Sequence, residues 1–535
     1  AVSVAPAVQG QLSLATLGLA WQPGAAVAVP LDLLQASPAL ALLTSDRPKI
    51  AHDVKSLLVN LSRHSIEARG FRDDVLLYAF LLSADPGACS LAVLTERFLD
   101  RKLDAAPEQQ ADCLLALQTR LAPEVDAQGL RELYESIDLP LAPVLARMES
   151  TGIRIEPAAL QTLAARMETE IARLTAAIHA LAGKPFNINS PQQLAKVLFE
   201  DLEIPVPGRS GKSKVVSTAA DVLDGLAEQH EIARLVREYR QLAKLKGTYV
   251  DALPALIDSR TGRLHTTFNQ AGAATGRLSS SNPNLQNIPI RTELGREIRA
   301  AFVPRAGWNL IVADYSQIEL RLLAHMSRDP VLLEAFRNGE DIHTRTAAEV
   351  FGVPPLMVTP EMRRNAKVVN FGIVYGQTPF GLAAQLGIAR KDAELYIQAY
   401  FSRYAGVRRF LDKTIAEVRH SGVARTLAGR KRPIPDMDSR NPNARSFAER
   451  TAVNTPLQGT AADLIKMAMI RIDQRLRGLE TKMLLQVHDE LVFEAPLTEV
   501  EEVKKMVKCE MEQVYSLDVP LLVDIGVGEN WRDAK

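Results

Sequence analysis

The sequence predicts a multidomain protein with α/β and α+β parts. At 535 residues the chain is longer than one domain, which usually has roughly 100 to 200 residues, and its apolar content of 47% can fill several cores. Short apolar runs alternate with helical stretches near its beginning, and two strand-like segments that end in acids lie further along. Because a long, mainly helical segment separates these two, we expect the chain to leave one domain, build another and return.

The first two predicted domains differ in their pattern of apolar residues. Residues 1–135 contain apolar runs such as 14–21 between helical stretches, which is typical of an α/β domain. Residues from roughly 140 to 250 contain long amphipathic helices instead, including one over 160–182. The pattern becomes mixed from residue 262, where strand-like and helical segments alternate.

A polar, basic loop at 207–214 lies between two of these helices. It contains Gly211-Lys212-Ser213, which resembles part of a phosphate-binding loop. However, Val206 stands where that motif requires its first glycine, and no strand leads into it. We therefore expect a flexible basic tip that could touch a nucleic-acid backbone.

Charge and composition narrow the class of protein. Lys plus Arg and Asp plus Glu both number 63, so a nucleic-acid surface must be local, and the stretch 403–450 is a candidate because it carries twelve Lys or Arg against five Asp or Glu. Three widely spaced cysteines fit a reducing cytoplasm and argue against disulfides or a structural zinc site. No apolar run approaches the roughly 18 residues that a membrane span needs. Since the first residue is Ala rather than Met, we expect a fragment or a processed product.

Two acids define the candidate catalytic site. An apolar run over 307–313 ends at Asp314 and continues as a helical pattern, and two short apolar strands meet at an acidic turn that contains Asp489. Mg²⁺ is bound through one or two carboxylates plus waters and substrate phosphates, so a site for two such ions needs few protein ligands. Each acid alone is more simply the polar end of a strand, but together they predict a metal site for nucleotidyl transfer.

A predicted helix carries cations and aromatic rings on one stripe. Pro360 suits its first position and Thr359 can cap it. Four residues then recur every fourth position, namely Arg363, Lys367, Phe371 and Tyr375. The cations can bind a triphosphate, and the rings can stack on a base or a sugar. An ordinary amphipathic helix would place aliphatic residues on its buried stripe, so this stripe indicates a nucleotide-binding role.

A third segment, 273–289, gathers small, hydroxyl and amide residues around Arg277. That composition suits contacts to phosphates and to the minor groove of DNA. Taken alone, the segment is equally compatible with a long surface loop.

These segments resemble the family-A DNA polymerases, with the large fragment of the bacterial DNA polymerase I group as the nearest type. The likeness extends to Asp341-Ile342-His343, to 451–463 and to Gly528-Glu529-Asn530-Trp531, and it covers essentially the whole chain. It implies a right-hand polymerase of palm, fingers and thumb beside an N-terminal RNase-H-like exonuclease-type domain. The implied boundaries are 1–135 for that domain, 136–265 for the thumb, 266–326 and 445–535 for the palm, and 327–444 for the fingers.

The resemblance also assigns roles to single residues. The family's acids for two Mg²⁺ ions, which Mn²⁺ can replace, correspond to Asp314 and Asp489, and Glu490 and Lys367 complete the catalytic group. The implied dNTP-binding residues are Arg363, Lys367, Phe371, Tyr375, His343, Gln317 and Glu319. The implied contacts to primer-template DNA are Arg277, Arg450, Asn454, Gln458 and His488. A cytoplasmic, nucleoid-associated monomer without a membrane segment is expected to act on primer-template DNA and dNTPs.

The N-terminal domain departs from the proofreading members of the family. Residues 1–31 contain no Asp or Glu, although those members need acids on the first strand. Gln110 occupies the expected position of a later acid, and the expected Tyr before it is missing, while Asp53 and Asp73 or Asp74 remain. We therefore expect a folded domain without 3′ to 5′ exonuclease activity, and 535 residues leave no space for a 5′ nuclease domain.

The leading hypothesis is a DNA-templated DNA polymerase for replication and repair synthesis that lacks proofreading. One alternative is a two-metal phosphodiesterase or nuclease, in which water attacks at the same acids. Another is a non-enzymatic nucleic-acid-binding protein, in which the acids are idle. The phosphodiesterase leaves the Arg-Lys-Phe-Tyr stripe without a role, and the dependence of product on added dNTPs would separate it from a polymerase. Metal-independent binding with no primer extension would support the binding protein.

Overall fold

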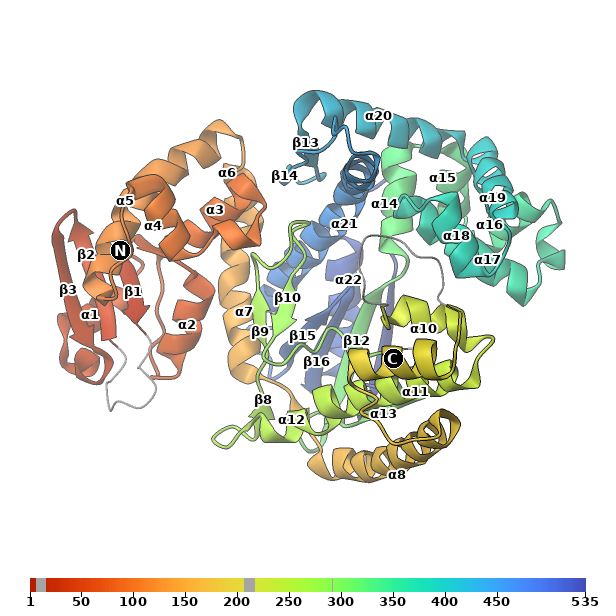
Figure 1. The fold of residues 1–535 in the computed structure, drawn as a ribbon. Coiled ribbons are helices and arrows are strands. Elements are labelled where there is room, and N and C mark those ends of the chain that lie inside the picture. Colours follow the sequence, from red (N-terminus) through yellow and green to blue (C-terminus); the bar gives the residue numbers. More distant parts are fainter. Residues whose placement is uncertain (6–15, 206–216, 291) are drawn as a thin grey trace.

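The computed structural model describes residues 1–5, 16–205, 217–290 and 292–535 (Figure 1). The expected basic tip at 207–214 lies outside these described residues. The N-terminal domain, in red and orange, stands beside a larger body built around a green and blue sheet. Two helical groups extend from this body, one in yellow and one in teal (Figure 1). None of the helices formed by the described residues combines the length and the apolar character that crossing a bilayer requires.

The N-terminal domain is built on two small sheets. Its strands are β1 (Val2–Ala5), β2 (Thr16–Gln22), β3 (Ala25–Pro30), β4 (Lys49–Ala51) and β5 (Phe71–Asp74). An antiparallel sheet has the order β1-β2-β3, and β4 pairs with β5 in parallel. The helices packed around them are α2 (Val54–Ser62), α3 (Val75–Ser83), α4 (Leu91–Leu99) and α5 (Pro107–Ala127). The sheets and helices bury their own apolar clusters, so the domain has its own core.

The larger body contains a four-stranded antiparallel sheet. Its strands are β12 (Trp308–Tyr315), β15 (Lys482–Val487), β16 (Glu490–Pro496) and β17 (Val523–Gly528). Their order is β15-β16-β12-β17, so β12 has a partner on both sides. Residues 310–313 of β12 are all buried, which explains why this strand is an uninterrupted apolar run in the sequence. Helix α22 (Val500–Glu512) packs on the sheet, and α21 (Pro442–Arg475) packs on α22.

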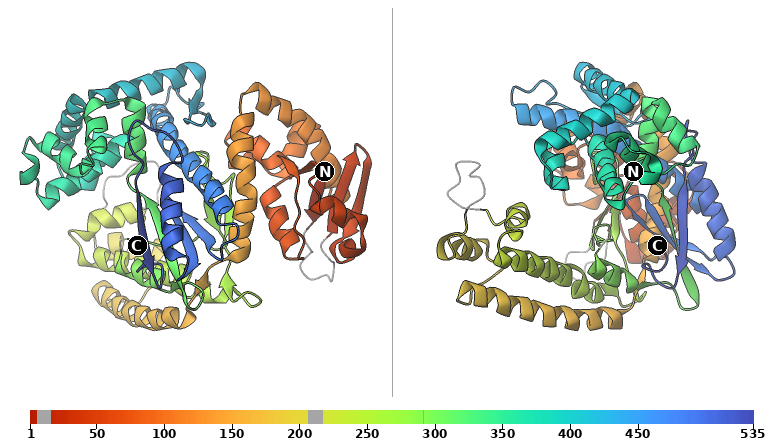
Figure 2. Two further views of the ribbon diagram at one scale, coloured as in Figure 1. Left: turned by 180° about the vertical axis from the view of Figure 1, so that it is seen from behind. Right: turned by 90° about the vertical axis from the view of Figure 1, so that its right-hand side faces the viewer.

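Helix α7 (Leu139–Thr151) lies between the N-terminal domain and this sheet (Figures 1 and 2). It packs against α2 on one side and against β15 and α21 on the other. Lys55 of α2 and Glu149 of α7 form an ion pair 2.9 Å long in which both side chains are buried. The Glu149 carboxylate also accepts the backbone N–H of Phe268 at 2.7 Å. The two parts of the molecule are therefore joined by a buried charge pair as well as by apolar packing.

Two helical groups flank the sheet. Between β12 and α21 lie α14 (Ile318–Ser327), α15 (Pro330–Arg337), α16 (Ile342–Phe351), α17 (Pro360–Val374), α18 (Pro379–Leu386), α19 (Arg390–Arg403) and α20 (Ala405–Ser421). A hairpin of β13 (Val423–Arg425) and β14 (Lys431–Pro433) follows. The other group contains α8 (Pro157–Ala182), α10 (Ala220–Ala227) and α11 (Glu231–Leu245). The right-hand view in Figure 2 shows α8 and α11 extending away from the sheet together.

Four buried charges tie the hairpin and α21 to the segment before α7. The Arg430 guanidinium donates two hydrogen bonds of 2.8 Å to Asp138 and one of 2.8 Å to Asp463. The Lys466 ammonium lies 3.4 Å from the Asp138 carboxylate. Burial alone would raise the pKa of Asp138, but the charges of Arg430 and Lys466 outweigh it and lower this pKa to about 2. The group therefore stays ionised and fixes three segments to one another.

Candidate active site

The two predicted acids lie at one edge of the four-stranded sheet. Asp314, near the end of β12, stands opposite Glu490 of β16. The turn between β15 and β16 consists of His488 and Asp489, and the carbonyl oxygen of Asp489 accepts the backbone N–H of Tyr315 at 3.1 Å. Two segments far apart in the sequence are thus joined by backbone pairing at the acids themselves, as the strand pattern predicted.

Crowding and burial disfavour negative charge at this edge. Burial raises the pKa of Asp314, Glu490 nearby raises it further, and Lys535 opposes the rise. Burial also raises the pKa of Asp489, with Glu319 adding to the rise and Arg277 opposing it. Carboxylates held together in this way gain from a bound cation, since an opposite charge favours their ionised form.

The donor chemistry of the acids suits a hard divalent cation. Asp314 and Asp489 offer carboxylate oxygens, the ligands that Mg²⁺ prefers. Across the described ranges, no group of three or more His, Cys, Asp or Glu side chains is arranged to hold a metal ion. Two carboxylates fit Mg²⁺ nevertheless, because this ion keeps several waters and takes further ligands from substrate phosphates.

Glu490 is oriented by its neighbours rather than left free. The indole N–H of Trp531 donates to Glu490 Oε1 at 2.7 Å, and the Lys535 ammonium pairs with Glu490 Oε2. The Arg299 guanidinium lies 3.6 Å from Oε1 and stacks 3.9 Å from the centre of the Trp531 ring. Three of these groups, those of Arg299, Trp531 and Lys535, were not predicted as site residues from the sequence.

The stripe on α17 forms as its caps predict. Thr359 accepts the backbone N–H of Met362 at 3.2 Å, and Pro360 occupies the first helical position. Arg363 near the start of the helix makes two hydrogen bonds to Asp341, at 2.6 and 3.0 Å. Lys367 is exposed, and no described residue lies within ion-pair distance of it. Both cations are exposed to solvent, so an anion can approach Lys367 directly and Arg363 in exchange for Asp341.

Aromatic rings continue the stripe toward the acids. The rings of Phe371 and Tyr375 are nearly parallel, 18° apart with centroids separated by 6.3 Å, and the His343 ring lies 5.9 Å from that of Phe371. Burial raises the pKa of Tyr375, and the nearby charge of Glu319 raises it further. Tyr375 also feels the charge of Asp489, so the end of α17 faces the acidic edge.

His343 is neutral in this arrangement. Burial lowers its pKa to about 4, with Asp341 partly opposing the shift. The amide Nδ2 of Asn370 lies 3.0 Å from His343 Nδ1, and the Asn370 carbonyl accepts the hydroxyl of Thr346. Since the amide N–H donates to Nδ1, the ring proton resides on Nε2, which leaves a neutral N–H donor.

Glu319 and Arg277 form an ion pair beside the aromatic rings. Glu319 lies on the first turn of α14 and is 5% exposed, and its Oε1 accepts from Arg277 Nη2. Its second oxygen, Oε2, is buried and has no hydrogen-bond partner. Gln317 precedes α14 with a φ of 55°, which turns the chain sharply between the strand and the helix. The segment after Asp314 thus places a buried, incompletely satisfied carboxylate next to the predicted nucleotide pocket.

Three further predicted residues lie on one face of α21. Arg450, Asn454 and Gln458 are spaced four residues apart, so they share a stripe. Arg450 borders a pocket of about 470 Å³ that Phe371 and Tyr375 also line. The Asn454 amide donates to the backbone carbonyl of Tyr375 at 3.4 Å. The α21 stripe and the end of α17 are therefore in contact, although the sequence alone does not place them together.

A glutamine pair supports the acidic turn. Gln286 follows β10 (Ser279–Ser281), and its amide donates to Oε1 and to the backbone carbonyl of Gln486, at 3.1 and 3.2 Å. Gln486 in turn donates to the carbonyl of His488. Both glutamines, with Arg277 and Asp489, line one small pocket. Their role was not predicted, because nothing in the sequence links positions so far apart.

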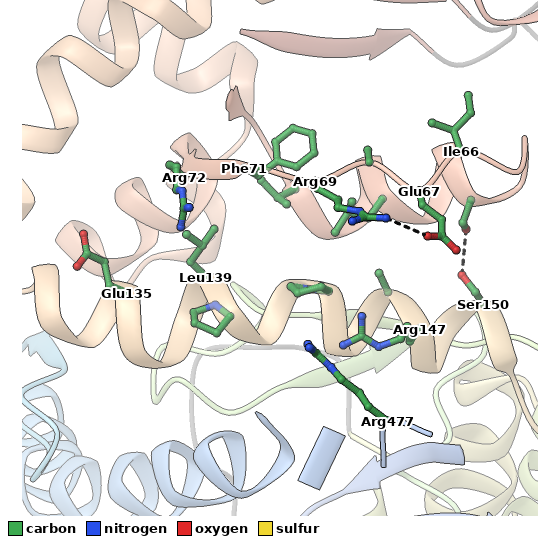
Figure 3. A pocket seen from close by; sticks show the side chains of 18 residues that line it. Ile66, Glu67, Arg69, Phe71, Arg72, Glu135, Leu139, Arg147, Ser150 and Arg477 are labelled. Atoms are coloured by element: carbon green, nitrogen blue, oxygen red, sulfur yellow. Dashed lines mark hydrogen bonds and ion pairs between the residues drawn. The ribbon is translucent and has the colours of Figure 1, made fainter. Parts of the chain in front are cut away.

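A pocket larger than those at the acidic edge lies elsewhere. It has a volume of about 980 Å³ and is formed between α2 and the segment after it on one side and α7 on the other. Figure 3 shows Phe71 and Arg72 on the side of the N-terminal domain, Leu139 and Arg147 on α7, and Arg477 pointing toward α7. Arg147 is paired with Asp473 of α21. Its lining contains neither predicted metal ligand, so size alone does not locate the catalytic site.

Comparison with known proteins decides the family. Residues 157–533, well over half of the chain, match the model of DNA polymerase family A. The chain belongs to that family. It is 48% identical over 463 residues to the thermostable DNA polymerase I of Thermus thermophilus, a match that covers 86% of this chain and 56% of the relative. For DNA polymerase I of Deinococcus radiodurans the identity is 46% over 496 residues, covering 92% of this chain and 51% of the relative.

The chain therefore spans a little more than half the length of these family-A relatives. A solved structure described as the POL domain of Pol1 from M. smegmatis in complex with DNA primer-template and dNTP is 38% identical and superposes with a TM-score of 0.92. The match covers 100% of this chain and 96% of that one. It confirms the right-hand polymerase fold expected from the sequence, whereas the roles of single residues stay predictions.

Proposed function

We propose that this chain is a DNA-templated DNA polymerase that extends a primer 3′-hydroxyl with dNTPs in replication and repair synthesis. The observation that supports this most is the meeting of Asp314 and Asp489 at one sheet edge, with the end of α17 facing them. Acids without the α17 stripe would suit a nuclease equally well. Acids together with cations and rings suit a nucleotide whose triphosphate and base must both be held.

Asp314 and Asp489 would hold two Mg²⁺ ions, with Mn²⁺ as a substitute, and such ions stabilise the attacking and leaving oxygens of an in-line displacement. Arg363 and Lys367 would bind the triphosphate and offset charge on the departing pyrophosphate. For Arg363 this requires exchanging Asp341 for phosphate, which its exposed position permits. His343 would donate its Nε2–H to a phosphate oxygen while remaining neutral.

The nucleotide's sugar and base would lie against Phe371, Tyr375, Gln317 and Glu319. Arg277 would contact the primer end, which requires its pairing with Glu319 to loosen. The primer-template would contact Arg450, Asn454 and Gln458 of α21 and His488 at the acidic turn. Glu490 would help to position the acid site and would not bind an ion itself, since Trp531 and Lys535 already hold both of its carboxylate oxygens.

We propose the same domain assignment for this chain as the resemblance implies. Residues 136–265 form the thumb, 327–444 the fingers, and 266–326 with 445–535 the palm. The four-stranded sheet and α21 support the palm, because they carry Asp314, Asp489 and the α21 stripe. Residues 1–135 form the exonuclease-type domain.

We further propose that this N-terminal domain does not proofread. The acids that remain from the expected motifs accept hydrogen bonds from their own surroundings. Asp74 accepts the backbone N–H groups of residues 53, 54 and 76. Asp73 accepts from the side chains of Tyr78 and Gln118. Asp53 caps α2 by accepting from the backbone and hydroxyl of Ser56. Two metal ions need several carboxylates, whereas those of Asp53 and Asp74 are engaged in helix caps and that of Asp73 in side-chain hydrogen bonds.

Primer extension with Mg²⁺ tests the polymerase proposal. Asp314→Ala or Asp489→Ala should abolish extension of a labelled primer, because each removes a ligand of the site that activates the hydroxyl. Binding of the primer-template should largely persist, since phosphate contacts dominate that affinity. Near-normal extension by either variant would refute the metal assignment. Shortening of the duplex without dNTPs, with no extension when they are added, would favour the phosphodiesterase instead.

A further inference from the structure

An ammonium group lies where the carboxylates of Asp314 and Glu490 meet. Lys535 Nζ is 3.4 Å from Asp314 Oδ2 and pairs with Glu490 Oε2. The Lys535 side chain is 31% exposed, so it has room to change conformation. It comes from the segment after β17, whereas both carboxylates belong to paired strands of the sheet. The position of this ammonium is therefore adjustable, and that of the acids is fixed.

Glu490 does not depend on this lysine for its orientation. Its Oε1 accepts from the Trp531 indole, and the buried Arg299 guanidinium, 2% exposed, lies 3.6 Å away. Arg299 is itself held by stacking on Trp531 and by a hydrogen bond to the Ile288 carbonyl. Arg299 thus provides Glu490 with a second cation, whose position is fixed by its own contacts.

Asp314 has a different environment. Among the described residues, Lys535 is the one Lys or Arg within ion-pair distance of its carboxylate. The cross-strand neighbour Glu490 repels its charge, as does Asp489. A cation that binds Asp314 at Oδ2 must therefore displace the ammonium, and one that binds at the other oxygen of the same carboxylate is repelled by it.

We infer that Lys535 is a tethered counter-ion of the acid site, which neutralises Asp314 in the metal-free protein and competes with divalent cations for Asp314 Oδ2. This inference rests on the proposed function, because that function assigns a metal to Asp314. The lysine then weakens cation binding in the absence of substrate. When a cation binds, the flexible side chain remains with Glu490 and leaves Asp314.

The test measures the binding of Mn²⁺ to the 535-residue chain in the absence of DNA and nucleotide. Binding is detected as the loss of the electron paramagnetic resonance signal of free Mn²⁺. Lys535→Met keeps the length of the side chain and removes its charge. It should bind Mn²⁺ about thirtyfold more tightly, the effect on a divalent ion of one like charge at roughly 4 Å in water. Lys535→Arg keeps the charge and should bind as the unchanged protein does. Unchanged or weaker binding by Lys535→Met, or equal tightening by Lys535→Arg, would overturn the inference.

Two controls separate this inference from the function on which it rests. Lys504→Met removes an ammonium that pairs with Glu501 on α22, and it should leave Mn²⁺ affinity unchanged. Asp314→Asn should weaken Mn²⁺ binding. In the Asp314→Asn background, Lys535→Met should no longer change the Mn²⁺ affinity. If Asp314→Asn has no effect, the metal assignment itself is wrong. If Asp314→Asn weakens binding but Lys535→Met does not tighten it, the counter-ion inference alone fails.

Discussion

Phe371 is the residue that we expect to distinguish a dNTP from its dideoxy analogue. Its ring lies between those of His343 and Tyr375 and carries no hydroxyl. A dideoxynucleotide has lost its 3′-hydroxyl, and phenylalanine cannot supply a hydrogen bond in its place. Phe371→Tyr should therefore raise incorporation of chain terminators about tenfold, the value of one good hydrogen bond. Competition between a dNTP and its dideoxy analogue in primer extension measures the ratio.

Phe401→Tyr is a matched control for this substitution. Phe401 lies on α19 with its ring against Tyr400, outside the predicted nucleotide site. Phe401→Tyr should leave the ratio of dideoxynucleotide to dNTP incorporation unchanged. If Phe371→Tyr also leaves it unchanged, the sugar pocket has been placed wrongly.

Glu319 is the second residue expected to select the sugar. It is buried, paired with Arg277 and has one unsatisfied oxygen. Glu319→Ala opens space for a 2′-hydroxyl and should admit ribonucleotides, at the cost of leaving Arg277 unpaired. Glu319→Gln keeps the volume and should retain most of the exclusion. Ribonucleotide incorporation that is equally low in the alanine variant would rule out this steric role.

The element scale shows which parts of the site a sequence can predict. Helix α17 was predictable from Thr359, Pro360 and the four-residue spacing, because helix caps and stripes are local. The strand that carries Asp314 was predictable for the same reason. The Arg299–Trp531–Glu490–Lys535 contacts were not, since they join positions whose proximity depends on the order of strands in the sheet. Arg430 looks like part of a basic surface in the sequence, yet it is buried between Asp138 and Asp463.

The charges around Arg430 predict a pH dependence of stability. The folded-state pKa of Asp138 is about 2, below its ordinary value of 3.8, so its contribution is present above pH 3.8 and is lost as the pH falls toward 2. Asp138→Asn should lower the free energy of unfolding at neutral pH by about 3 to 5 kcal/mol, because it leaves Arg430 and Lys466 buried without their full partner. It should also remove this residue's part of the stability change between pH 3.8 and about 2.

Urea unfolding followed by tryptophan fluorescence measures both effects. Asp473→Asn is a suitable comparison, because Asp473 pairs with the exposed Arg147 and should contribute less than about 1 kcal/mol. Equal losses in the two variants at neutral pH would mean that the buried group contributes no more than a surface pair.

At the scale of the whole molecule, the N-terminal domain and the polymerase body should behave differently toward mismatches. A primer with a mismatched 3′ end, incubated with Mg²⁺ and no dNTPs, should keep its length, because the acids of the domain are engaged in helix caps and side-chain hydrogen bonds. Gel electrophoresis of the labelled primer over time provides the measurement. Steady shortening that Asp53→Ala abolishes and Asp314→Ala does not would contradict this expectation.

The buried pair of Lys55 and Glu149 has a consequence for any attempt to shorten the protein. Removal of residues 1–135 would take away more than the core of the N-terminal domain. It would leave the Glu149 carboxylate of α7 without its cation and would expose the face of α7 that α2 covers. The domain therefore supports the helix that lies against β15 and α21, whatever chemistry it carries out itself.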